Sequence, residues 1–399
     1  MAADRVGAVD RGSTRAIALL AAAAFVATAT LRVADPLIPQ IAQSFGSTVA
    51  GASVVATGAA LSYGLFQIVY GAVGERFGKF TVVTVVTLGS ALTTAAAALA
   101  DSLLMLGVLR FLTGATAACV IPLAVAHIGD VVPYEGRQAV LGRFLSGQIL
   151  GVLFGQAFGG ILGDHLSWRG VFLVLGTLHL FVDGLLWLEL ASGRIAERRV
   201  RGGGMTSLPG RYLAVLRIRR ARSVLGFVTA EGFLLFGGLT YIAAYLRHDF
   251  ALGYGAIGGV LAGFGAGGMI YSITVTRLVP ALGERGMAAV GGALMAVGFA
   301  GCALAPAWPA FFLAASALGL GFYMHHATLQ TNATQMAPEA RGFAIGLFAF
   351  SLYVSQAIGV ALCGVVIELL GYRWMFGLLA PAVLTLGLCY AASLPPRKS

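Results

Sequence analysis

Twelve runs of mostly apolar residues divide this chain, and each is about as long as one membrane-spanning helix. A helix needs roughly 20 residues to cross ~30 Å of hydrocarbon, and only a helix satisfies its own backbone groups there. The composition agrees, because 58% of the residues are hydrophobic, 11% are charged and the mean hydropathy is +0.88. We therefore predict an all-α integral membrane protein whose spans are residues 16–38, 51–72, 81–100, 103–127, 138–162, 169–191, 222–246, 254–276, 287–306, 308–332, 342–367 and 373–393.

The two halves of the chain repeat one pattern at a constant offset of 204 residues. Parallel repeats are typical of transporters, in which two similar bundles rock about a site between them. The repeat predicts two pseudo-symmetric six-helix bundles, residues 1–191 and 222–399, joined by a cytoplasmic linker at 192–221. Asp164 is matched conservatively by Glu368. The residues that recur identically are Arg137, Gly142, Phe144, Gly155, Ala157, Gly160, Leu166, Arg169 and Phe172.

Basic residues set the orientation, because they stay on the cytoplasmic side of a membrane. With both termini in the cytoplasm, that side holds all of the 26 Lys and Arg except Arg32, Arg110, Arg169, Arg247 and Arg373. We therefore predict a multi-pass protein of the cell (inner) membrane with both termini cytoplasmic. The asymmetry explains the net charge of +10 without a nucleic-acid partner, and contact with anionic lipid is a secondary possibility.

Sequence motifs for catalysis and for cofactors are missing. The sequence holds no Gly-x-x-x-x-Gly-Lys phosphate loop, no His-Glu-x-x-His and no Gly-x-Ser-x-Gly. The cysteines Cys119, Cys302, Cys363 and Cys389 have no paired spacing. We predict no enzyme activity, no cofactor and no metal site, and an ion gradient as the energy source. A membrane-embedded enzyme or a sensor is the alternative from another class.

The turn between the second and third spans reads Gly71-Ala-Val-Gly-Glu75-Arg76-Phe-Gly78-Lys79. Gly71 would let two helices approach closely and Gly78 would permit a tight turn. The charges could pair with each other or with a helix end. This turn resembles the signature Gly-x-x-x-Asp-Arg-x-Gly-Arg/Lys of the major facilitator superfamily, with Glu75 in place of Asp. The resemblance implies a latch that closes the cytoplasmic side in the outward-facing state.

Two further segments are similar to this superfamily. Arg110 is followed four residues later by Gly114, as in the family's fourth helix, and a glycine ladder resembles the fifth-helix pattern of its antiporters. We expect the ladder to form a smooth face against the opposite half. Within the superfamily, the chain is most similar to bacterial twelve-helix drug and metabolite proton antiporters. The residues of this helix-5 gate motif are Gly151, Gly155, Gln156, Gly159 and Gly160, where Gln156 replaces the usual Pro.

Charged residues inside the membrane are costly and therefore mark functional positions. Arg32 and Asp35 share one face of the first span, and Arg110 lies at a comparable depth in the fourth. The resemblance implies that helices 1, 4, 7 and 10 line a central cavity, so Asp35 and Arg110 could pair across it. Loss of water from the cavity raises the pKa of a carboxyl group, and an adjacent guanidinium lowers it. A conformational change that alters either influence would make the carboxyl bind or release a proton. A static ion pair that holds two helices together is the alternative.

Glu231 lies in the seventh span with no basic neighbour in the sequence. Proton coupling, recognition of a cationic substrate, or a neutral carboxyl bonded to a neighbouring helix would each explain it. In the tenth span, Tyr323, His326, Gln330 and Thr334 share one face, opposite His325 and Asn332, and periodicity does not decide which face meets the cavity. The candidate substrate-binding residues are Phe25, Thr113, Tyr241, Tyr323, His326 and Gln330.

These features together predict a monomeric secondary active transporter. It would export a small organic compound, drug-like or metabolite, in exchange for protons, with Asp35, Arg110, Glu231 and Arg32 handling charge. Uptake symport or facilitated diffusion of a nutrient or vitamin is the runner-up, because Gln156 departs from the antiporter pattern.

Overall fold

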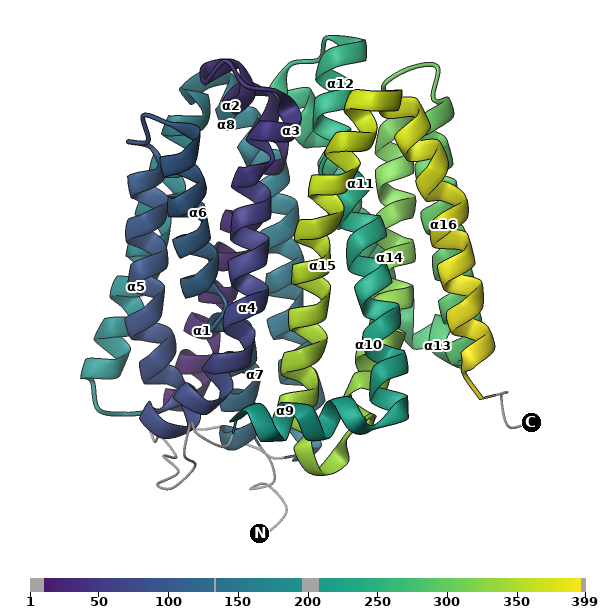
Figure 1. Cartoon of the computed structure of the whole chain (residues 1–399). Coiled ribbons are helices and arrows are strands. Elements are labelled where there is room, and N and C mark those ends of the chain that lie inside the picture. Colours follow the sequence, from purple (N-terminus) through teal and green to yellow (C-terminus); the bar gives the residue numbers. More distant parts are fainter. Residues whose placement is uncertain (1–10, 133, 196–207, 396–399) are drawn as a thin grey trace.

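The protein is a bundle of membrane-length helices. The structure, a computed structural model, describes residues 11–132, 134–195 and 208–395, and every regular element in those ranges is a helix. Nine helical segments there are long and apolar enough to cross a membrane. Two of the nine hold two spans each, and α14 (Ala310–Gln335) adds another, which confirms the twelve predicted spans. Figure 1 shows α1 beginning and α16 ending at the same end of the bundle, which we call the basal end.

The first half carries six spans, some of them made of two elements. Pro36 and Pro39, which lack a backbone N–H, follow the end of the first helix and accompany its break into shorter pieces. The elements are α1 (Arg11–Arg32), the 3-10 turn η1 (Asp35–Leu37), α2 (Ile38–Ser44), α3 (Val49–Ala52), α4 (Val54–Phe77), α5 (Lys79–Ala97), α6 (Leu103–Ala117), α7 (Val120–Val131) and α8 (Tyr134–Ala191).

The second half carries the other six spans, and its first is interrupted. The sequence predicts one continuous helix over 222–246, but the structure divides this stretch into four elements. The elements of this half are α9 (Leu208–Arg217), α10 (Arg219–Glu231), the π-helix η3 (Gly232–Phe236), α11 (Gly237–Leu239), α12 (Ile242–Phe250), α13 (Tyr254–Leu304), α14, the 3-10 turn η4 (Pro338–Ala340), α15 (Arg341–Leu370) and α16 (Tyr372–Ser393).

The backbone repeats the duplication that the sequence shows. Ser167 has φ 59° and separates the two spans within α8. Gly371, 204 residues later, has φ 83° and separates α15 from α16. Gly283 (φ 62°) likewise divides α13 into two spans. The left-handed region stops a helix sharply, so the halves turn at equivalent places, which confirms the two pseudo-symmetric bundles.

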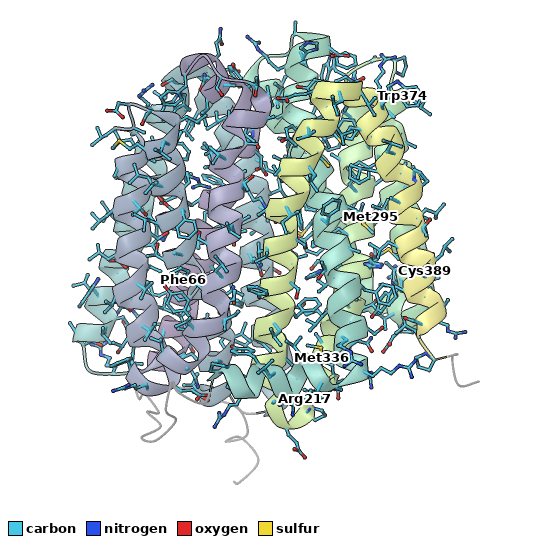
Figure 2. All side chains as sticks on the ribbon, viewed as in Figure 1. Phe66, Arg217, Met295, Met336, Trp374 and Cys389 are labelled. Carbon is cyan, nitrogen blue, oxygen red and sulfur yellow. The ribbon has the colours of Figure 1, made fainter. Side chains whose placement is uncertain are left out.

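Apolar side chains cover the outside of the bundle as well as its interior. Leu188, Ile273 and Trp374 are 66%, 72% and 69% exposed, and Figure 2 shows such side chains projecting around the molecule along most of its height. Water would penalise this much exposed apolar surface, whereas lipid accepts it. Such an outer surface is typical of a membrane-spanning protein.

The two halves meet along two seams. At one seam α4 lies beside α15 (Figure 1), and the rings of Tyr63 and Tyr353 are 4.5 Å apart. At the other, α8 packs against α13. A methyl group on Gly160 would lie 2.1 Å from the carbonyl oxygen of Tyr254, so only glycine permits this approach of the two backbones.

The glycine ladder of α8 packs mainly within its own half. Methyl groups on Gly151 and Gly155 would each lie 2.5 Å from a carbonyl oxygen of α1, and one on Gly159 would lie 2.8 Å from that of Val33, directly after α1. The expectation that the ladder faces the opposite half is therefore wrong for these three residues, and among the glycines of the motif only Gly160 meets the other half. The ladder lets α1 and α8 form one close-packed pair.

We expect Gly155→Val to prevent normal assembly of the first half. The new side chain would strike the carbonyl of Ala29, and overpacking of this kind costs about 3 kcal/mol or more against unyielding backbone. The measurement is the unfolding temperature and the monodisperse fraction in detergent. Gly184→Val in the same helix is the control, because a methyl group there meets nothing within 4 Å. Equal behaviour of the two variants would contradict the close packing.

Candidate functional site

Asp35 lies in the break after α1 and is almost completely buried, with 3% of its surface exposed. Its carboxylate oxygen Oδ2 is 3.8 Å from Nη1 of Arg32, one turn earlier. The guanidinium carbon of Arg32 also lies 4.4 Å from the centre of the Phe236 ring. Since Phe236 belongs to η3 of the second half, Arg32 connects the buried carboxylate to the opposite bundle.

Arg110 is fully buried in α6 and is held by backbone carbonyls. Its Nε donates to the oxygen of Val55 at 3.3 Å, and its Nη2 donates to that of Leu31 at 3.4 Å. The expected Asp35–Arg110 ion pair does not form within the described residues, because these carbonyls take the guanidinium and Arg32 is the partner of Asp35. Arg110 is still close enough to act on the Asp35 charge.

Two further polar groups lie near Asp35. Gln156 is fully buried and interacts with the Asp35 carboxyl, but its amide atoms form no hydrogen bond of standard geometry among the described residues. Nη1 of Arg110 is also buried and has no hydrogen-bond partner in that part of the chain. A buried unsatisfied polar atom costs about 1–3 kcal/mol, so such atoms rarely accumulate without a role. Gln156, the residue that replaces the Pro of the antiporter pattern, thus adds hydrogen-bonding capacity next to a buried acid.

Glu231 ends α10 in the second half and binds two adjacent histidines of α14. Its Oε1 is 2.7 Å from Nδ1 of His325, and its Oε2 is 2.6 Å from Nδ1 of His326. The sequence did not reveal this cluster, because adjacent side chains on a helix diverge by about 100°. A carboxylate has two oxygens and can reach both rings from one side. Glu231 is fully buried, and the His326 side chain is 15% exposed.

The helix that carries Glu231 changes its winding at the next residue. The π-helix η3 begins at Gly232, where a methyl group would lie 2.4 Å from the carbonyl oxygen of Leu352 in α15. A π turn is rare and often occurs at functional sites. Here the wider turn brings the helix against α15 directly after the carboxylate.

The structure separates the two faces of α14. His325 and Asn332 are buried, whereas Tyr323 and His326 are partly accessible and Gln330 is exposed. The accessible face is therefore the one with Tyr323, His326 and Gln330, and His325 holds Glu231 from the buried side.

Other predicted binding residues are engaged by the protein itself. Thr113 is buried, donates to the oxygen of Leu109 at 2.9 Å and lies 2.9 Å from the hydroxyl of Thr93. Tyr241 is 1% exposed, and its hydroxyl donates to the carbonyl of Val360. Neither side chain is therefore accessible to a substrate in this structure. Phe25 is partly accessible and packs on Phe154, with ring centres 5.2 Å apart.

Among the described residues, the turn between α4 and α5 forms an ion pair within the first half. Gly78 has φ 98°, as the predicted tight turn requires. Lys79 pairs with Asp130 of α7, a partner that the sequence did not indicate. Glu75 and Arg76 are exposed, with no ion pair among the described side chains.

Gly71 does not make the expected close helix contact, because a methyl group there would meet nothing within 4 Å. The close contact lies one turn later. A methyl group on Gly74 would come 2.4 Å from Leu123 of α7.

At the end opposite the basal one, an acid of the first half caps a helix of the second. Asp164 in α8 accepts hydrogen bonds from the backbone N–H groups of Tyr254 (2.9 Å) and Gly255 (2.6 Å), at the start of α13. A carboxylate at a helix N-terminus satisfies free donors and complements the helix dipole. This contact joins the two halves at that end, and Arg32 on Phe236 joins them deeper in the bundle.

We expect Asp164→Ala to loosen this contact between the halves. Removing the acceptor frees two amide groups, and a hydrogen bond to a charged group contributes about 1.5–3 kcal/mol. Amide hydrogen exchange at residues 254–258 should therefore accelerate by about tenfold or more. His165→Ala, at the exposed neighbouring position, should leave the exchange rate unchanged. Unaltered exchange in Asp164→Ala would show that the cap does not hold the halves together.

Both the sequence and the fold match known membrane proteins. The family model of the Major Facilitator Superfamily matches residues 20–339 and 225–399. The uncharacterized MFS-type transporter YwfA of Bacillus subtilis (strain 168) is 26% identical over 372 residues, which cover 91% of this chain and 88% of that protein. The multidrug export protein EmrB of Haemophilus influenzae is 27% identical over 173 residues, or 43% of this chain and 34% of that protein. The crystal structure of the nucleoside transporter NupG has a TM-score of 0.76 at 14% identity, over 95% of this chain and 100% of that one, and so shows the fold alone.

Proposed function

The chain belongs to the major facilitator superfamily, and from that membership we propose that it exports a small organic compound in exchange for protons by alternating access. Two buried carboxylates, Asp35 and Glu231, lie one in each half and would carry the protons. The partly accessible Tyr323 and His326 would meet an aromatic or cationic substrate. Similarity to the drug exporter EmrB supports export over uptake.

One observation carries this proposal: Arg32 touches both Asp35 and the opposite half. When Asp35 is ionised, its charge holds the guanidinium at the seam, against Phe236. Protonation of Asp35 would remove that attraction and weaken the contact that closes the opposite end. A buried acid whose charge biases one of two arrangements is what coupling requires.

We further propose that the structure represents the state open toward the basal end, and that this end faces the cytoplasm of the inner membrane. Asp164 and Arg32 would close the opposite end, while at the basal one Gly71 has no close neighbour and Glu75 is exposed, among the residues that the structure describes. The latch motif would engage α15 in the alternate state. We assign residues 1–191 and 222–399 to the two moving bundles and 192–221 to their linker, with the monomer as the working unit.

Everted membrane vesicles with an acidic interior test the proposal. Vesicles containing the protein would be incubated with a small-molecule extract of the host cells, and their contents compared by mass spectrometry with vesicles lacking it. We expect at least one organic compound to accumulate, and a protonophore to abolish the accumulation. No gradient-dependent accumulation of any compound would overturn the proposal.

Uptake symport or facilitated diffusion is the second candidate, because Gln156 stands where the antiporter pattern has Pro. The same vesicles distinguish it. A symporter would release a preloaded compound together with protons, and a facilitator would equilibrate it regardless of the gradient.

A further inference from the structure

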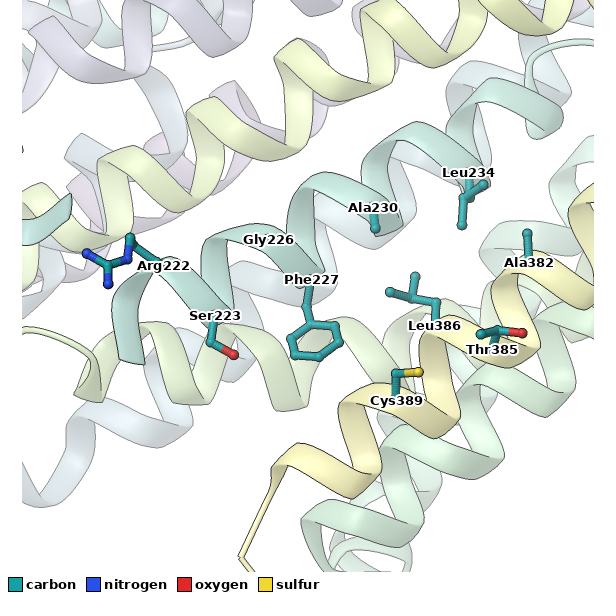
Figure 3. A pocket seen from close by; sticks show the side chains of 10 residues that line it. All are labelled: Arg222, Ser223, Gly226, Phe227, Ala230, Leu234, Ala382, Thr385, Leu386 and Cys389. Carbon is teal, nitrogen blue, oxygen red and sulfur yellow. The ribbon is translucent and has the colours of Figure 1, made fainter. Parts of the chain in front are cut away.

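A groove of about 480 Å³ runs along the outside of the second half, between α10 with η3 on one side and α16 on the other. Figure 3 shows Phe227, Ala230 and Leu234 of the first wall facing Ala382 and Leu386 of the second. The lining residues are Arg222, Ser223, Gly226, Phe227, Ala230, Leu234, Ala382, Thr385, Leu386 and Cys389.

The groove matches the geometry of one membrane leaflet. From Arg222 to Leu234 the helix rises by about 18 Å, which is close to half of the ~30 Å of hydrocarbon. The lining is mainly apolar, and its charged residue, Arg222, lies at one end of the groove in the first turn of α10, with the guanidinium extending past that end (Figure 3). A ligand that fits has an apolar chain and an anionic group at one end.

The charge at the mouth is fixed in place. Arg222 is exposed, and its Nη1 donates to the carbonyls of Leu216 and Arg217 at the end of α9. The neighbouring Arg219 begins α10, whose N-terminus has no side-chain cap. Basic residues near the membrane surface attract anionic lipid headgroups, and each contributes about 1 kcal/mol to the free energy of binding.

We propose that this groove binds one anionic phospholipid, with its phosphate at Arg222 and an acyl chain between α10 and α16. The bilayer surrounds this outer face, so lipid is the molecule that meets it. The floor of the groove continues to the Glu231 cluster, because the Phe227 ring is 4.9 Å from that of Tyr390, which is 5.2 Å from that of His325. A bound lipid would hold α10 against α16 at the helix that carries Glu231. The inference does not depend on the direction of transport or on proton coupling.

Cys389 reports occupancy of the groove, because it lines the groove and is exposed, whereas the other three cysteines are buried. The rate of its modification by a maleimide would be followed in detergent during titration with phosphatidylglycerol or phosphatidylcholine of the same chain length. We expect phosphatidylglycerol to protect the thiol at about fivefold lower concentration. Arg222→Gln should abolish this preference. Arg277→Gln, an exposed arginine on another helix, should preserve it.

Filling the groove provides a second variant. Ala382→Trp should remove the protection by lipid, whereas Leu388→Trp, on the exposed side of the same helix, should retain it. If Ala382→Trp fails to fold, the surface substitution Arg222→Gln decides alone. Equal protection by the two lipids, an unchanged preference in Arg222→Gln, or the same protection by inorganic phosphate alone would each overturn the proposal.

Discussion

Asp35→Asn is expected to abolish gradient-driven transport while leaving substrate exchange intact. Asparagine keeps the size of the side chain but cannot take up and release a proton in the transport cycle. We expect driven flux to fall at least about 100-fold, which corresponds to about 2.7 kcal/mol. Exchange of labelled for unlabelled substrate without a gradient needs no net proton movement, and we expect it to stay within about threefold of the wild-type rate. Both rates would be measured in the same proteoliposomes.

Asp101→Asn is the matched control, because Asp101 is exposed in the connection between α5 and α6, whereas Asp35 is buried. It should retain both activities. Wild-type driven flux in Asp35→Asn would remove Asp35 from the coupling mechanism. Loss of both activities with normal folding would instead mean that the carboxylate binds substrate or holds the helices in place.

The twelve spans and the duplication were predictable because both depend on local pattern. A run of about 20 apolar residues is sufficient to identify a crossing, and the matched turns at Ser167 and Gly371 lie at the offset that the sequence shows. The interruption after Glu231 was not predictable. The apolar run continues through Gly232, and the π turn depends on contact with Leu352, more than 100 residues away in the chain.

Individual charged residues of the site were predictable, but their partners were not. Asp35 and Glu231 stand out because charge within an apolar run is costly. The groups that surround them come from other helices. Arg32, the partner of Asp35, packs on Phe236 of the second half, and Glu231 binds the histidine pair of α14. Periodicity in the sequence shows which residues share one face of a helix, but it does not show which other helix packs against that face. The ladder of Gly151 and Gly155 illustrates the same limit. A smooth glycine face predicts close packing against another helix, but it does not identify that helix as α1.

Glu231→Gln is expected to impair both driven flux and exchange, in contrast to Asp35→Asn. In wild type, each carboxylate oxygen of Glu231 faces the Nδ1 atom of one histidine, at 2.7 Å for His325 and 2.6 Å for His326. A glutamine keeps only one such oxygen, and its NH2 group would face the other imidazole nitrogen. His326 lies on the accessible face of α14, so its changed orientation would alter the substrate site as well as the proton site. We expect both rates to fall at least about tenfold. Loss of two charge-assisted hydrogen bonds, at about 1.5–3 kcal/mol each, should also lower the unfolding temperature.

Glu368→Gln is the matched control, because Glu368 is an exposed glutamate of the same half and should keep wild-type rates and stability. His326→Ala separates the two roles of the cluster. It leaves Glu231 bonded to the buried His325, so we expect weaker substrate binding, seen as a raised KM, and a smaller fall in the unfolding temperature than in Glu231→Gln. If Glu231→Gln transports normally, the buried histidine–glutamate cluster only joins α10 to α14. If it retains exchange and loses driven flux alone, Glu231 carries protons without shaping the substrate site.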